Sequence, residues 1–270
     1  MTSGLGLPLP GVLTQYRVFP EYGLVKAPDY LSDEEAATLP IAGVTAWMAI
    51  NGMRPLGQAG GKGEKVLIQG TGGVAVNGLL IAKASGAEGN LSSFVLVVSR
   101  QDARKLEKWS SRVTVIITSS SDAKLEQAKK LGADKTINYR TTKNWDQEVL
   151  SLTDNEGVDI IFENGGAQTL RKSFECVTFG GLINCIGYLS GKVDDAEDRT
   201  NTNLLALKRN VTLKGILNGP RERFEEMLEF YEKKGIKPVV DKVFTFEESK
   251  EALHYLFAGG HFGKVVIKIE

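Results

Sequence analysis

The chain has 270 residues, of which 42% are apolar and 24% are charged, and this composition is ordinary for a globular protein. Its 33 lysines and arginines balance 33 aspartates and glutamates, so net charge favours neither nucleic acid nor an anionic membrane as a partner. No apolar run reaches the roughly 18 residues of a membrane span, and the N-terminus lacks the regions of a signal peptide. We therefore expect a cytoplasmic protein.

The first 60 residues carry few signals of regular structure. Residues 11–26 contain apolar and aromatic residues around a Pro/Gly turn, and we expect short strands there. Ser32 and Glu35 have the spacing of a capping box, which predicts a helix that runs toward Trp47. Pro40 must kink or break that helix.

Farther along, short apolar runs alternate with amphipathic helical stretches, which is the pattern of a parallel α/β sheet. A helix is expected at Asp122–Leu131, with Asp122 as its N-cap and Gly132 beyond its end. Six such runs with crossover helices predict a doubly wound Rossmann sheet, whose ligand binds beyond the carboxyl ends of the strands. The expected strands are Lys65–Gln69, Thr114–Thr118, Lys135–Tyr139, Val158–Phe162, Leu182–Ile186 and Val211–Leu217.

The last 33 residues return to a β-rich pattern. We expect a strand in KPVVDKVFTF, a helix near Glu247–Phe257, a turn at AGGHFG and a final strand in KVVIKI.

A glycine-rich motif follows the first expected strand of the Rossmann sheet. Gly70, Gly72 and Ala75 satisfy the spacing G-x-G-x-x-G/A between an apolar strand and a helix. Gly70 permits the tight turn, Gly72 lets the backbone approach a pyrophosphate, and Ala75 permits close helix–strand packing. The helix that follows offers free N–H groups to phosphates. The motif predicts a dinucleotide site.

The residues after the second expected strand bear on which dinucleotide binds. An NAD site usually carries Asp or Glu there for the ribose 2′-OH. This chain instead has Ser119, Ser120 and Ser121, followed by Lys124. Hydroxyls and an ammonium favour a 2′-phosphate, whereas an acid would repel it. We therefore predict NADP(H) as the cofactor.

Several stretches, in order, resemble the medium-chain dehydrogenase/reductase superfamily, in its quinone oxidoreductase-like and zinc-type alcohol dehydrogenase-like branches. They are EEAATLPIAGVTAW, VLIQGTGGVA, TSSSDAKLEQAKKLGAD, INYR, VDIIFENGG, GGLINCIG and HFGKVVIKI. The resemblance implies roles for four groups of residues. Thr45 approaches the nicotinamide; Gly72, Gly73 and Val74 hold the pyrophosphate; Lys124 and Tyr139 flank the adenosine phosphates; Ile186, Gly187 and Leu217 line the nicotinamide pocket.

Structural alternatives stay open at three of these positions. Tyr139 could simply end a strand, and Ile186 and Leu217 could belong to the core.

The resemblance also implies a domain organisation. Residues 1–45 match the last segment of a GroES-like catalytic domain, residues 46–237 match the Rossmann domain, and residues 238–270 return to the catalytic domain. Zinc-dependent members have a cysteine ligand where this chain has Ile41, so we expect no metal. Cys176 and Cys185 lie in apolar surroundings, where we expect core thiols.

Residues 88–113 form an insertion relative to the family. Phe94–Val98 could be an extra strand, which would place Ser99 and Arg100 at the phosphate position. Alternatively the insertion is an excursion on the surface or an artefact of the gene model, and Ser119 then lies about 23 residues after Gly70, near the usual spacing of about 20. We prefer the second interpretation, in which Thr114–Thr118 pairs directly with Lys65–Gln69.

The sequence thus predicts a non-zinc, NADP(H)-dependent oxidoreductase that reduces a carbonyl, a quinone or another activated alkene. Its partner is a small-molecule substrate, and a homo-oligomer is compatible with this class. No residue stands out as catalytic. The alternative is a truncated nucleotide-binding remnant without turnover. Because most of the catalytic domain has no counterpart in this chain, we expect weak cofactor binding and little turnover.

Overall fold

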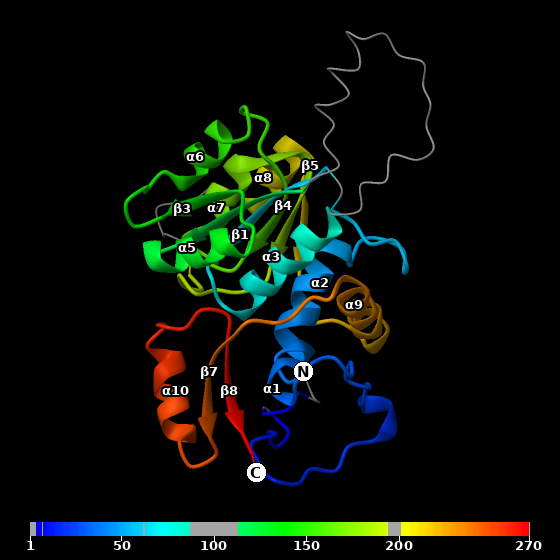
Figure 1. The fold of residues 1–270 in the computed structure, drawn as a ribbon. Coiled ribbons are helices and arrows are strands. Elements are labelled where there is room, and N and C mark those ends of the chain that lie inside the picture. The colour runs from blue at the N-terminus through cyan, green and yellow to red at the C-terminus, as the bar shows by residue number, and fades with distance from the viewer. Residues whose placement is uncertain (1–3, 7, 62, 87–112, 194–200, 270) are drawn as a thin grey trace.

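The computed structural model describes residues 4–6, 8–61, 63–86, 113–193 and 201–269. A six-stranded parallel sheet has the strand order β3-β2-β1-β4-β5-β6, and a separate sheet pairs β7 with β8 (Figure 1). This order is that of the doubly wound dinucleotide-binding fold and confirms the predicted fold class. The six strands are β1 Lys65–Gln69, β2 Thr114–Ser119, β3 Lys135–Asn138, β4 Val158–Glu163, β5 Val177–Cys185 and β6 Thr212–Gly215.

The strand next to β1 is β2, with Lys65 opposite Thr114 and Gln69 opposite Thr118. The predicted pairing of these two segments is confirmed. Phe94–Val98, with Ser99 and Arg100, lies outside the described residues. Gly86 and Val113 come together on either side of that segment: a Cβ on Gly86 would lie 2.7 Å from the Val113 nitrogen. The described residues on the two sides of that segment therefore lie next to each other.

Helices cover both faces of the large sheet, because successive side chains of a strand point to opposite faces. Val66 and Ile68 of β1 pack into one core, and Leu67 packs into the other; all three are fully buried. The first core involves α2 Val44–Asn51, α3 Gly73–Ser85, α5 Asp122–Lys130 and α9 Arg221–Lys234. The second involves α6 Trp145–Ser151, α7 Leu170–Cys176 and α8 Thr202–Arg209.

The N-terminal segment differs from its prediction. Residues 11–26 contain a short 3₁₀-helix, η1 Glu21–Gly23, and no strands. A strand needs a neighbour to pair with, and Tyr16 and Val18 are 90% and 94% exposed, so they pack against nothing that would hold one. The expectation of strands at 11–26 is wrong for this reason.

The predicted capping box does form. The Ser32 hydroxyl accepts a hydrogen bond from the Glu35 backbone, and the Glu35 carboxylate accepts one from the Ser32 backbone, at 3.2 and 3.0 Å. It opens α1 Asp33–Ala36. A π-helical turn, η2 Leu39–Gly43, follows and contains Pro40; α2 then continues to Asn51. The proline interrupts the helix as predicted.

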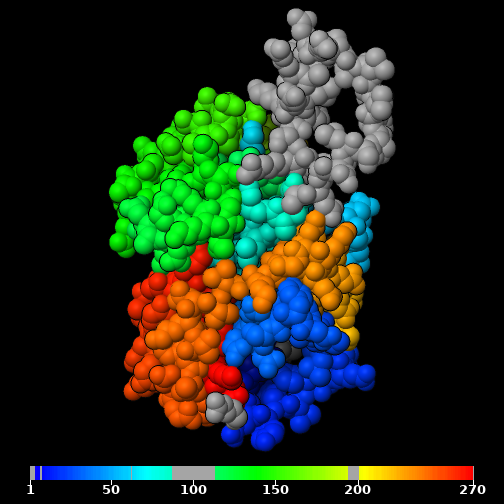
Figure 2. Space-filling view, viewed as in Figure 1, coloured from blue at the N-terminus to red at the C-terminus, as the bar shows by residue number. Residues whose placement is uncertain are grey.

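The C-terminal elements also match their prediction. They are β7 Val240–Thr245, α10 Ser249–Phe257 and β8 Lys264–Lys268, and the two strands are parallel. Figure 1 draws them below the Rossmann sheet, and Figure 2 shows this C-terminal part against the N-terminal segment. The Tyr30 hydroxyl donates to the Ile236 carbonyl at 2.6 Å, and burial raises the pKa of Tyr30 to about 12.

Within the described residues, no helix is long and apolar enough to cross a membrane.

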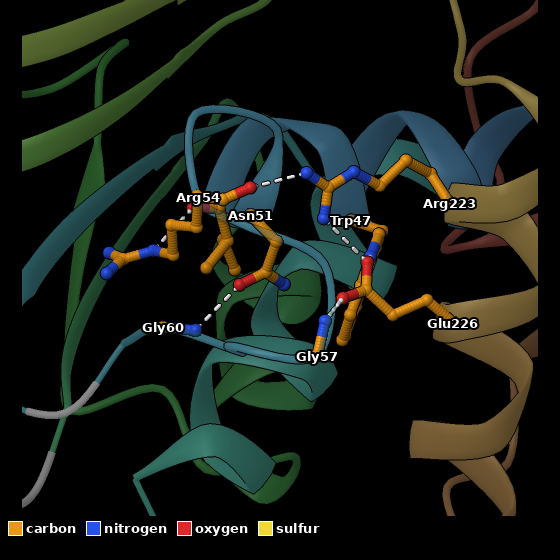
Figure 3. Close-up of polar contacts among 8 residues, drawn as sticks. Trp47, Asn51, Arg54, Gly57, Gly60, Arg223 and Glu226 are labelled. Atoms are coloured by element: carbon orange, nitrogen blue, oxygen red, sulfur yellow. Dashed lines mark hydrogen bonds and ion pairs between the residues drawn. The ribbon is translucent and has the colours of Figure 1, made fainter.

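A polar network ties α2 and the loop after it to α9 (Figure 3). The Glu226 carboxylate accepts hydrogen bonds from the Trp47 indole at 2.9 Å, the Gly57 backbone at 2.6 Å and Arg223 at 2.8 Å. Burial opposes ionisation of Glu226, but these donors outweigh it and lower the pKa of the carboxyl group. The network fixes α2, which carries Thr45, relative to the rest of the Rossmann domain.

Candidate nucleotide-binding site

The glycine-rich loop lies between β1 and α3, at the carboxyl end of the strand. Gly70 has φ +86°, a left-handed conformation that favours glycine. Its N–H donates to the Thr118 carbonyl at 2.9 Å, which ties the turn to β2. Gly72 is the N-cap of α3 and provides no side-chain cap for its first turn. The first N–H groups of α3 thus remain available to an anion.

The environment of Gly72 supports a ligand at this place. Its backbone is extended, at φ −80°, so other residues could adopt it without strain. A Cβ on Gly72 would meet no atom within 4 Å. Nothing in the described chain therefore requires glycine at this position, whereas a phosphate approaching the backbone would require it.

Gly73, which we expected at the pyrophosphate, also makes room for neighbouring elements. A Cβ there would lie 2.3 Å from Cδ of Lys264 and 3.1 Å from the Ala42 Cβ. The lack of a side chain lets β8 and η2 approach the start of α3. Gly72 also bridges to Gly263, whose N–H donates to the Thr71 carbonyl at 3.0 Å. The C-terminal turn thus docks on the glycine-rich loop.

Lys264 is a charged residue at this site for which the sequence suggested no role. Its stem crosses Gly73 at the positive end of α3, and burial lowers the pKa of its ammonium group. Its Nζ makes no hydrogen bond to the described residues. The sequence contained the signal only indirectly, in a lysine that directly follows the turn before the last strand.

Helix–sheet packing depends on one further glycine. Ala75 is buried as expected, but the closest approach occurs one turn later, where a Cβ on Gly78 would lie 2.6 Å from the Phe162 ring. Val74 is half-buried and packs against the same core.

The three serines at the end of β2 have different surroundings. The Ser119 hydroxyl is buried 3.4 Å from the Thr71 hydroxyl, and Ser121 is the N-cap of α5, accepting from the Lys124 backbone. The prediction of Asp122 as the cap is therefore wrong: Asp122 is already helical, and its carboxylate accepts from the Asn138 amide at 2.7 Å. Ser120 is half-buried and makes no side-chain hydrogen bond within the described residues.

Lys124 has an intramolecular partner in the structure. Its ammonium donates to the Gly259 carbonyl at 2.6 Å, in the turn before β8. His261 lies close by, and its buried Nδ1 has no hydrogen-bond partner in the described part of the chain. Burial and the charge of Lys124 lower the pKa of His261. Two lysines and a histidine thus lie beside the glycine-rich loop, namely Lys124, Lys264 and His261.

A cavity of about 310 Å³ opens at the carboxyl ends of β1, β2 and β4. It brings together predicted site residues Gly70 and Tyr139, the latter 41% exposed. The residues that line it are Gln69, Gly70, Thr118, Tyr139, Lys143, Trp145, Asn164, Gly165, Gln168, Thr169, Lys172, Leu189 and Ser190. It is the hollow expected for a nucleotide in a doubly wound sheet.

The residues assigned to the nicotinamide end differ widely in burial. Thr45 is 2% exposed, and its hydroxyl has no hydrogen-bond partner among the described residues. Ile186 is half-buried against the first core, and the Gly187 N–H donates to the Glu163 carbonyl at 3.2 Å. Leu217 is 60% exposed and is not a core residue.

The described residues do not fit a zinc ion. They contain no group of three or more His, Cys, Asp or Glu side chains that could hold a metal. Ile41 is exposed on η2, and burial raises the pKa of Cys176 and raises that of Cys185 to about 11. Such thiols are unreactive at neutral pH.

Comparisons with known proteins agree with this geometry. The family profile of zinc-binding dehydrogenases matches residues 108–233. A zinc-type alcohol dehydrogenase-like protein of Schizosaccharomyces pombe is 39% identical over 99% of this chain and 69% of its own length. An alcohol dehydrogenase of Sinorhizobium meliloti has a TM-score of 0.79 at 37% identity, over 98% of this chain and 67% of that one.

A solved NAD-dependent alcohol dehydrogenase has a TM-score of 0.75 at 29% identity, over 98% of this chain and 67% of that one. This chain spans 69% of the length of the Schizosaccharomyces pombe relative and 60% of the length of a zinc-type alcohol dehydrogenase-like protein of Leptosphaeria maculans. The matches run through the glycine-rich loop, the strand ends and the C-terminal return, all within one fold. The chain belongs to the medium-chain dehydrogenase/reductase superfamily, in its zinc-type alcohol dehydrogenase-like branch.

Proposed function

We propose that this chain is the nucleotide-binding part of a non-zinc, NADP(H)-dependent oxidoreductase that reduces a carbonyl, a quinone or another activated alkene. The observation that carries the proposal is the open space above Gly72, at the N-terminus of α3 and beside the 310 Å³ cavity. A dinucleotide fits this arrangement, because its pyrophosphate would take the space that an additional side chain would fill.

The preference for NADP(H) rests on the end of β2. An acid at that position would bind the ribose 2′-OH of NAD, and this chain has serines there. Asp122, the nearest acid, is held by Asn138 at 2.7 Å. Ser120 and Lys124 are then the groups that would meet a 2′-phosphate, and Lys124 would exchange the Gly259 carbonyl for it.

When bound, the nicotinamide supplies the hydride. The residues of this chain bind and orient it: the N–H groups of α3 and the Lys264 ammonium would hold the pyrophosphate. The Thr45 hydroxyl, buried and unpaired, would hold the nicotinamide end. No described side chain has a geometry that assigns it a proton-transfer role.

The test is to titrate the protein with NADPH and NADH, in wild type and in Lys124→Ala. We expect NADPH to bind more tightly. The substitution should weaken NADPH binding by about 1.5–3 kcal/mol, because it removes a charge-assisted contact, and should leave NADH binding almost unchanged.

Lys130→Ala is the matched control, since Lys130 ends the same helix and is exposed. Equal affinities of the wild type for NADPH and NADH would contradict the NADP(H) preference. Equal NADPH affinity in wild type and Lys124→Ala would contradict the role of Lys124.

A second candidate is a nucleotide-binding protein without turnover. The exposure of Leu217 favours it, since that residue is assigned to the nicotinamide pocket and lies open to solvent. Cofactor binding without NADPH oxidation across a panel of quinones, enals and aldehydes would support this candidate.

A further inference from the structure

Glu163 is the last residue of β4, and its side chain is fully buried. Its Oε1 atom accepts hydrogen bonds from the N–H groups of Gly165 and Gly166, at 3.0 and 2.9 Å, and from the Thr169 hydroxyl. One carboxylate oxygen thus gathers three donors from a single loop. These three hydrogen bonds hold the side of residues 164–169 that faces the protein interior.

The other oxygen of Glu163 faces β1 and α7. Oε2 accepts from the Gln69 amide at 2.7 Å and from the Ser173 hydroxyl. The side-chain amide oxygen of Gln69, Oε1, accepts from the N–H groups of Asn164 and Gly165, both at 3.2 Å. Glu163 and Gln69 together therefore satisfy the backbone donors of this loop and join it to the strand that precedes the glycine-rich turn.

The outer side of the same loop faces the cavity. Asn164, Gly165 and Thr169 line it opposite Gly70. The Asn164 amide donates to the Gln69 carbonyl of the backbone at 2.7 Å, which fixes its side chain at the rim. Only the loop 164–169 thus lies between the buried Glu163 carboxylate and the cavity.

We propose that Glu163 and Gln69 are positioning residues, which hold residues 164–166 in the shape that receives the adenosine half of the dinucleotide. This inference rests on the proposed nucleotide binding. It assigns adenosine to the cavity because the first three strands of a doubly wound sheet bind that half. Glu163 does not line the cavity and acts through the loop, whereas Gln69 lines the cavity and also binds the loop.

The direction of each hydrogen bond gives the reason for a carboxylate at position 163. In Glu163→Gln, an amide NH₂ that replaced Oε1 would face the N–H groups of Gly165 and Gly166. If it replaced Oε2 instead, the Gln69 amide would have to turn over to accept from it. The NH₂ of Gln69 would then face the N–H groups of Asn164 and Gly165. Gly165 keeps one acceptor in either arrangement, but the N–H of Gly166 or that of Asn164 loses its acceptor. That loss is costly because both donors are partly buried.

The experiment measures binding of ADP-ribose and of NADPH to wild type and Glu163→Gln, together with the thermal melting of both. We expect ADP-ribose and NADPH to bind about ten- to hundredfold more weakly to the variant. Unchanged affinity in a folded Glu163→Gln protein would overturn the proposal. A wild type that binds neither ligand would instead refute the proposed function, so the two failures are distinguishable.

Two further variants keep the test valid if Glu163→Gln does not fold. Thr169→Val removes a hydroxyl donor on the loop side, and Ser173→Ala removes one on the α7 side, away from the cavity. Both should lower the melting temperature, and Thr169→Val should also weaken ADP-ribose binding severalfold. A loss of affinity in Ser173→Ala equal to that in Thr169→Val would overturn the proposal, as would none in Thr169→Val.

Discussion

Single residues at the glycine-rich loop have separable roles. Gly70 is required by its left-handed backbone, Gly73 by the approach of Lys264, and Gly72 by neither conformation nor packing. The three glycines of this loop look equivalent in the sequence, but each is explained by a different feature of its surroundings. At Gly72 the described chain imposes no such constraint, and our proposal attributes the glycine to the approach of a phosphate.

Gly72→Ala should therefore separate binding from stability. Alanine suits φ −80° and meets no neighbour, so the melting temperature should stay the same or rise slightly, since alanine restricts the unfolded chain. NADPH affinity should fall by about tenfold or more, equivalent to about 1.4 kcal/mol. Fluorescence titration and thermal melting measure both quantities.

Gly70→Ala is the control for this prediction. Its positive φ should make alanine cost about 1–2 kcal/mol of stability. Full NADPH affinity in Gly72→Ala would show that no phosphate approaches that backbone.

At the scale of elements, α9 holds α2 and its following loop through Glu226 (Figure 3). Glu226→Gln should destabilise the protein by about 1.5–3 kcal/mol near neutral pH, because hydrogen bonds to a charged group are lost. The pKa of Glu226 lies below its ordinary value of 4.5 in the folded protein. Its contribution is therefore full above that value and is lost as pH falls through the folded pKa.

Urea unfolding of wild type and Glu226→Gln between pH 3 and 7 tests this prediction, and the two should converge at low pH. Glu225→Gln is the matched control, since Glu225 pairs with Arg221 on the exposed side of the same helix. It should change stability by less than about 0.5 kcal/mol. A pH-independent difference between wild type and Glu226→Gln would show that packing, not charge, explains the effect.

At the scale of the molecule, the two ends of the proposed site are unequally enclosed. The adenosine end has a cavity of about 310 Å³, whereas Leu217 and Tyr188 beyond β5 and β6 are 60% and 61% exposed. Hydride transfer requires a well-oriented, water-excluded nicotinamide. The chain by itself should thus bind the adenosine half better than it supports catalysis.

We predict that this 270-residue chain, expressed alone, turns over little or no substrate. Assays would follow NADPH oxidation with quinones, enals and aldehydes, after gel filtration to establish its oligomeric state. Turnover of about 1 s⁻¹ or more, within the ordinary range of enzymes, would contradict the prediction if the protein is monomeric. If it is a homo-oligomer, a second copy could cover the nicotinamide end.

The sequence by itself determined the parts of this protein that depend on local order. Apolar runs of five to seven residues and the glycine motif after β1 predicted the doubly wound sheet and its ligand edge, and the capping box at Ser32 predicted a helix. These signals are local, because strand and turn preferences act over a few neighbouring residues. The same reasoning failed at residues 11–26, where strands depend on a partner that the sequence pattern does not supply.

Only the tertiary structure decided which side chains meet at the site. Lys264 crosses Gly73 and Lys124 reaches Gly259, across separations of more than 130 residues. In the sequence, Glu163 is a single acidic residue at the end of an apolar strand. In the folded protein, its carboxylate accepts hydrogen bonds from the backbone of the loop that follows β4. Such contacts arise from how strands and the C-terminal turn pack together, and no spacing along the chain encodes them.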